Sequence, residues 1–81
     1  MFNKTAATAF SAAQRIAAEM RSVQVKEEAL NEALEKAVDQ SSRMVIENEI
    51  IRLCAHWHRL YQEYTKTFAE YTAAVEATRS G

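Results

Sequence analysis

The chain has 81 residues, with no proline and a single glycine, Gly81. Any internal turn must therefore form without either residue type, which argues against hairpin-rich β folds and against phosphate-binding glycine loops. Ten Lys and Arg against eleven Asp and Glu give a formal net charge of −1, so no basic excess favours nucleic-acid binding. We expect one all-α domain over residues 1–81, without a membrane span because no run approaches the ~20 apolar residues required.

The N-terminal segment 1–18 is rich in Ala, Ser and Thr and contains Lys4 and Arg15 but no acidic residue. This composition is typical of an amphipathic targeting segment and also of a helix that packs through its alanines. We favour the packed helix and expect a cytoplasmic protein. The only cysteine, Cys54, cannot form an internal disulfide, which fits a reducing compartment.

Apolar residues recur at alternating steps of three and four, the period of an α-helix. In the first half the stripe comprises Ala6, Ala9, Ala13, Ile16, Met20, Val23, Leu30, Leu34 and Ala37. In the second half it comprises Ile46, Ile50, Leu53, Trp57, Leu60, Tyr64, Thr67, Tyr71 and Ala74. A further row follows at seven-residue spacing: Cys54, Tyr61, Phe68 and Val75. The pattern predicts two long helices, over about residues 4–39 and 43–79.

The polar run from Asp39 to Ser42 is the best candidate for a turn between the two helices. We expect the turn near 39–42, with Ser41 or Ser42 as the N-cap, because a serine hydroxyl accepts hydrogen bonds from the free amides of a helix start. One alternative is a single continuous helix. Another is three helices with a break near 22–25, where β-branched residues flank Ser22. We prefer an antiparallel hairpin of two helices.

Residue sizes support the hairpin. If the chain reverses near residue 41, facing positions add up to about 82, so the small Ala9 and Ala13 lie opposite the large Tyr71 and Phe68. The second helix has three apolar positions per heptad, a wider stripe than one partner helix covers. We therefore predict a homodimeric four-helix bundle with coiled-coil packing, or cover by another protein. The predicted interface comprises Ile50, Leu53, Trp57, Tyr61, Tyr64, Phe68 and Tyr71.

Few residues offer chemistry. Cys54 and His58 are four apart and share a helix face, so two chains together could supply two Cys and two His ligands for a metal ion. The simpler interpretation is a small buried thiol and a histidine at the edge of the stripe. Glu27 occupies an apolar position of the first stripe, opposite Cys54 and near His58, and we interpret Glu27 and His58 as a polar seam. We predict no catalytic residue, no cofactor site and no metal site.

Arg52, Arg59 and Lys66 form a row at seven-residue spacing on the second helix. Such rows are usually solvated faces, although this one would be the contact surface if the protein bound RNA. We predict a small non-catalytic regulator that binds another protein through the aromatic helical face, as an adaptor, inhibitor or chaperone of the kind that bacteria and phages encode. The alternatives are a dimeric four-helix RNA-binding regulator and, last, a metal- or redox-dependent helical protein.

Overall fold

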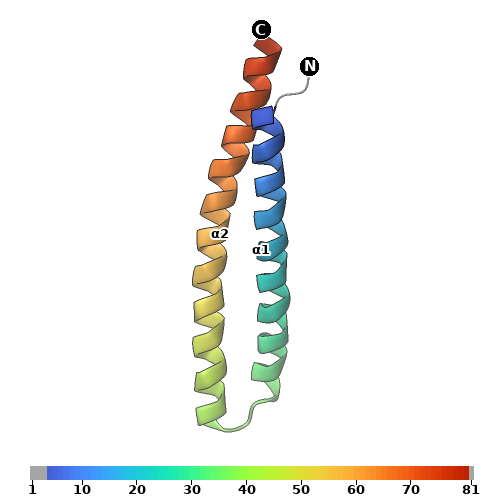
Figure 1. The fold of residues 1–81 in the computed structure, drawn as a ribbon. Coiled ribbons are helices and arrows are strands. Elements are labelled where there is room, and N and C mark those ends of the chain that lie inside the picture. The colour runs from blue at the N-terminus through green and yellow to red at the C-terminus, as the bar shows by residue number, and fades with distance from the viewer. Residues whose placement is uncertain (1–3, 81) are drawn as a thin grey trace.

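The protein is a helical hairpin (Figure 1). The computed structural model describes residues 4–80, which form α1 (Lys4–Lys36) and α2 (Gln40–Ser80). The helices run antiparallel and pack along their length into a rod of 63 × 15 × 13 Å. Residues 4–80 contain no strand. The predicted all-α hairpin is thereby confirmed.

α1 continues without interruption through residues 22–25, so the alternative break into three helices does not occur. The positions of the two valines on the helix explain why their β-branched side chains do not interrupt it. Val23 is only 5% exposed and packs in the seam between the helices, while Val25 is 63% exposed on the outer side. Packing therefore compensates for the modest helix propensity of Val23, and the exposed Val25 costs the helix only that small propensity difference.

The turn comprises residues 37–39, slightly earlier than predicted, and the predicted serine cap is wrong. Asp39 caps α2: its Oδ2 accepts a hydrogen bond from the Ser42 backbone N–H at 3.0 Å. The Ser42 side chain, and then this N–H, hold the pKa of the Asp39 carboxyl below its usual range. Aspartate three residues before the bonded amide is the standard capping geometry, and it starts the helix at Gln40 rather than after Ser41.

Arg43 closes the turn from the other side. Its Nη1 donates hydrogen bonds to the carbonyl oxygens of Leu34 and Ala37, at 3.4 and 3.3 Å, in the last turn of α1 and just beyond it. These carbonyls belong to the group that a helix end leaves without intrahelical partners. No non-glycine residue of the described chain has a positive φ. The reversal therefore needs no glycine: Asp39 of the turn caps the start of α2, and Arg43 of α2 caps the end of α1.

The seam between the helices buries few side chains: Ala6, Ala9, Ala13, Val23 and Leu60. The register agrees with the predicted one, since the rings of Phe10 and Tyr71 lie 5.2 Å apart, at positions that add up to 81. The whole chain exposes 6311 Å². A compact monomer of 9.2 kDa exposes about 4,900 Å², so the hairpin leaves about 1,400 Å² more in water than its mass requires.

Candidate interaction surface

One exposed side of α2 carries no Lys, Arg, Asp or Glu over seven turns, and we call it the aromatic flank. Residues three and four apart lie one above another on a helix, which places eight residues in this strip. They are Ile51, Cys54, His58, Tyr61, Thr65, Phe68, Thr72 and Val75. Seven of them are exposed and Val75 is half-buried. At 1.5 Å per residue the strip is about 36 Å long.

Large apolar groups dominate the aromatic flank. Ile51 is 66% exposed, Tyr61 50% and Phe68 43%. The exposed rings of Tyr61 and Phe68 each stack on a second ring of α2. Tyr61 stacks on Trp57 at a centroid distance of 5.4 Å, and Phe68 stacks on Tyr64 at 5.8 Å. Trp57 and Tyr64 are half-buried residues of the seam. The exposed rings therefore start from fixed positions, which lowers the conformational entropy lost when a partner covers them.

The two threonines between the rings behave as apolar groups. The Thr65 hydroxyl donates a hydrogen bond to the Tyr61 carbonyl at 2.9 Å, and the Thr72 hydroxyl donates one to the Phe68 carbonyl at 3.0 Å. Such bonds back to the preceding turn are common for threonine in helices. Because each hydroxyl has a backbone acceptor, a partner that covers these threonines leaves no unpaired donor. The aromatic flank is thus less polar than its composition indicates.

A shallow depression of about 270 Å³ lies between α1 and the aromatic flank. Arg21 and Gln24 line it together with the apolar Ala17 and Met20 of α1 and with Trp57, Tyr61 and Tyr64 of α2. Phe10 of α1 is also exposed, near Phe68 through their shared neighbour Tyr71. A partner laid along the aromatic flank would therefore also meet apolar groups of α1.

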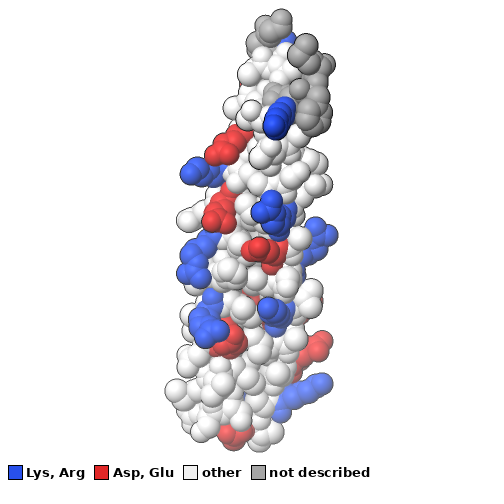
Figure 2. Space-filling model, in the orientation of Figure 1, with Lys and Arg blue, Asp and Glu red and all other residues white. Residues whose placement is uncertain are grey.

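The opposite side of α2, the charged flank, carries all the charged residues of α2 between positions 51 and 75: Arg52, Arg59, Glu63, Lys66 and Glu70. It includes the basic row that was the alternative RNA contact. Acidic residues lie between the basic ones, and Arg52 pairs with Glu49 at 3.2 Å. Figure 2 shows the same mixture on one face of the rod, where basic and acidic side chains alternate over both helices.

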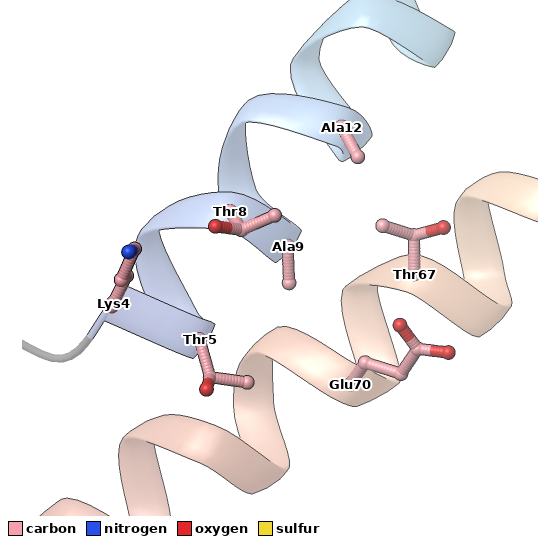
Figure 3. A pocket seen from close by; sticks show the side chains of 7 residues that line it. All are labelled: Lys4, Thr5, Thr8, Ala9, Ala12, Thr67 and Glu70. Atoms are coloured by element: carbon pink, nitrogen blue, oxygen red, sulfur yellow. The ribbon is translucent and has the colours of Figure 1, made fainter.

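Alanines of α1 leave a hollow beside the charged flank. Figure 3 shows Ala9 and Ala12 of α1 opposite Thr67 and Glu70 of α2. The depression has a volume of about 480 Å³ and is open to solvent, with Lys4 at its rim. Small side chains on one helix and short or polar ones on the other account for it without a ligand.

The predicted interface residues fall into two groups. Five are half-buried and lie in the stripe that packs on α1: Ile50, Leu53, Trp57, Tyr64 and Tyr71. The other two, Tyr61 and Phe68, are exposed on the aromatic flank. The first group builds the hairpin and supports the second, so only Tyr61 and Phe68 offer large free surfaces to a partner.

Glu27 lies where the register places it, and lines a depression of about 290 Å³ with Cys54, Trp57 and His58. Glu27 is half-buried, whereas Cys54 and His58 are exposed. Within residues 4–79 the Glu27 carboxylate makes no hydrogen bond or ion pair. Nor does any group of three His, Cys, Asp or Glu side chains in the described chain have the arrangement that holds a metal ion. The Glu27–His58 seam stays a prediction, and a metal site shared by two chains stays the less favoured alternative.

The Trp57 indole Nε1 is buried and has no hydrogen-bond partner among the described residues. Trp57 borders the depressions on both sides of Gln24 and makes an edge contact with the His58 ring at 5.7 Å. An unpaired buried N–H destabilises a fold by roughly 1–3 kcal/mol. The hairpin retains it at the point where the seam and the aromatic flank meet.

Sequence reasoning missed several exposed apolar residues. Phe10 lies one position beyond the alanine stripe, and nothing in its neighbourhood marks it as exposed. The exposure of Ile51 could have been predicted from the sequence. Ile51 lies seven residues from both Met44 and His58, and this row runs beside the predicted row that contains Cys54 and Tyr61. Near the turn, the exposed apolar residues are Val38, Met44, Val45 and Ile51.

Comparison with protein-family models, with curated proteins and with solved structures finds no match for this chain. Within the described residues, neither helix contains an apolar stretch long enough to cross a membrane.

Proposed function

We propose that the protein is a non-catalytic protein-binding regulator, of the adaptor, inhibitor or chaperone type, and that the aromatic flank is its binding surface. The proposal rests on the way α2 separates its charged from its uncharged residues. One side of the helix exposes about 36 Å of surface without a charged residue, and all the charges of that segment lie on the opposite side. Uncharged strips with exposed aromatic rings are enriched in protein interfaces.

Binding would complete a helical bundle. A partner helix laid along α2 meets Ile51, Tyr61 and Phe68, which recur at the helical spacing that a second helix can match. The backbone of α2 is fully formed before binding, and the stacking on Trp57 and Tyr64 fixes the two rings. The contact would cover part of the surface that the single hairpin leaves in water in excess of a compact chain of its mass.

The charged flank supports nucleic-acid binding less well. Three basic residues in a row would attract phosphates, but Glu63 and Glu70 stand in the same strip, and Arg52 is already paired with Glu49. Phosphate binding depends on net positive potential, which this alternation largely cancels. No aromatic residue lies within the charged flank to stack on a base.

Site-specific photocrosslinking in the source cell tests the proposal. A photoreactive phenylalanine analogue replaces Tyr61 on the aromatic flank or, as the matched control on the same helix, Lys66 on the charged flank. We expect adducts with protein at position 61 and few at position 66. Equal yields at the two positions, or adducts with nucleic acid at position 66, would overturn the proposed surface.

A further inference from the structure

We propose that a second copy of this chain covers the aromatic flank, with the two α2 helices antiparallel about a two-fold axis level with residue 63. The inference rests on the proposed function, because it names the partner of the same surface. It follows from three properties of the strip: the charges at its ends, the sizes of the residues between them, and the area that the hairpin leaves exposed.

The two heptad rows that make up the strip extend beyond it by one charged residue at each end. One row continues back to Glu47 and the other forward to Arg79, and both residues are exposed. Over positions 44–79 these are the only charged residues in the two rows. In an antiparallel pair whose facing positions add up to 126, Glu47 of each copy meets Arg79 of the other. Both ends of the interface then carry an ion pair.

The alternatives place these charges poorly. A parallel pair in register sets Glu47 against Glu47 and Arg79 against Arg79, which repels at both ends. Antiparallel helices shifted by one heptad, with facing positions that add up to 119, place Glu47 opposite Thr72 and Arg79 opposite Gln40, so neither charge meets an opposite one. Charge complementarity therefore selects one orientation and one register.

The same register matches residue sizes. Tyr61 of one copy faces Thr65 of the other, so each large ring lies against a side chain whose methyl group is free to contact it. The remaining facing pairs are Cys54 with Thr72, His58 with Phe68, and Ile51 with Val75. The Tyr61–Thr65 layers combine a large with a small group, the Ile51–Val75 layers are aliphatic, the His58–Phe68 layers are aromatic, and the Cys54–Thr72 layers pair two small groups.

The single hairpin leaves more surface in water than a compact chain of its mass, by about 1,400 Å². The exposed Ile51, Tyr61 and Phe68 of the aromatic flank belong to that surface, and a second copy would cover them. The aromatic flank also lies roughly a quarter turn from the face of α2 that packs on α1. Two hairpins joined through it form a four-helix arrangement in which each helix has antiparallel neighbours.

Charge exchange tests the orientation in the full-length protein. Glu47→Lys alone creates two like-charged Lys–Arg contacts in a dimer, and Arg79→Glu alone creates two Glu–Glu contacts. A mixture of the two variants has an attractive pair at both ends. In sedimentation equilibrium we expect each variant to self-associate about tenfold more weakly than wild type and the mixture to recover, while Lys66→Glu on the charged flank has no effect.

Oxidative crosslinking tests the register without weakening the fold. The two Cys54 thiols of an antiparallel dimer lie roughly 27 Å apart, so oxidised wild type gives no disulfide-linked dimer. Thr72→Cys places a thiol opposite Cys54 of the other copy, and oxidation should link two chains. A linked wild-type dimer, or a Thr72→Cys variant that stays unlinked, overturns the antiparallel register.

The two proposals fail differently. If purified wild type sediments as a monomer at high micromolar concentration while position 61 still crosslinks to a different protein, the second copy is excluded and the protein-binding function stands. If position 61 crosslinks to nothing more than position 66 does, both proposals are wrong. A position 61 adduct of twice the chain mass supports the second copy, and the absence of any other protein adduct there would contradict the adaptor, inhibitor or chaperone role of this surface.

Discussion

Tyr61 stacks on Trp57 one helical turn away, with ring centroids 5.4 Å apart and ring planes inclined by 13°. The half-buried Trp57 belongs to the seam with α1, and the exposed Tyr61 belongs to the aromatic flank. The contact therefore joins the surface that would bind a partner to the packing that holds the hairpin. Disturbing Trp57 should loosen both.

Substitution of Trp57 should reveal the cost of its unpaired indole N–H. Trp57→Ala should lower the free energy of unfolding by about 2–4 kcal/mol, through lost burial and a residual cavity. Trp57→Phe should cost less than about 1.5 kcal/mol, since it keeps a ring in the seam and removes a buried donor without an acceptor. Urea unfolding followed by circular dichroism at one protein concentration measures both; equal losses would contradict this account.

Val23 and Val25 provide a matched pair for the seam, since the same substitution is made two residues apart in one helix. Val23→Ala should destabilise the hairpin by about 1.5–3 kcal/mol, because the valine is only 5% exposed. Val25→Ala should change stability by less than about 0.5 kcal/mol, because its side chain is mostly in water and alanine is the better helix former. Thermal unfolding distinguishes them, and a larger loss at Val25 would refute the observed helix rotation.

Asp39 should make the stability of the hairpin depend on acid pH. Its pKa in the folded protein lies below its ordinary value of 3.8, so folding favours the ionised form. The resulting stabilisation is complete above the ordinary pKa and declines as the pH falls through the lower folded value. Asp39→Asn keeps an N-cap that does not titrate. Unfolding at about pH 5 and about pH 2 should show wild type losing more stability than the variant; identical losses would remove Asp39 from the account.

Arg43 should contribute to the turn through the α1 carbonyls that it binds. Arg43→Ala should cost about 0.5–1 kcal/mol and increase amide hydrogen exchange in the last turn of α1. Arg59→Ala, which removes an exposed arginine from the charged flank, is the control and should leave that exchange unchanged. If both variants exchange alike at residues 33–37, Arg43 does not cap α1.

The periodicity of the sequence was sufficient to predict the hairpin, its register and the faces that pack. Val23 lies within the predicted stripe and Val25 outside it, as observed. The cap was harder, because Asp39, Ser41 and Ser42 all have suitable side chains. Which one caps depends on where α1 ends, and Arg43 influences that end through a contact nine residues back. The capping preferences of single residues cannot predict a contact over that distance in the sequence.

The candidate surface was predictable in part. The seven-residue row identified Tyr61 and Phe68, but Trp57, Tyr64 and Tyr71 were grouped with them as equal contributors. A broad apolar stripe shows that more than one helix can pack on α2, yet which rings α1 covers depends on the rotation of α2, a property of the folded pair. The sequence pattern did not predict the contact of Phe10 with Tyr71, because Phe10 lies outside the alanine stripe of α1.

The accessibility of Cys54 tests the central claim most directly, because the only thiol of the chain lies on the aromatic flank and is exposed in the single hairpin. Its rate of alkylation by maleimide is measured in the source cell and after dilution of the purified protein. A Cys54→Ser, Lys66→Cys variant reports the charged flank. We expect Cys54 to react about tenfold more slowly in the cell than after dilution, while the thiol at position 66 reacts equally in both. Equal protection of both positions, or none at Cys54, would contradict the central claim.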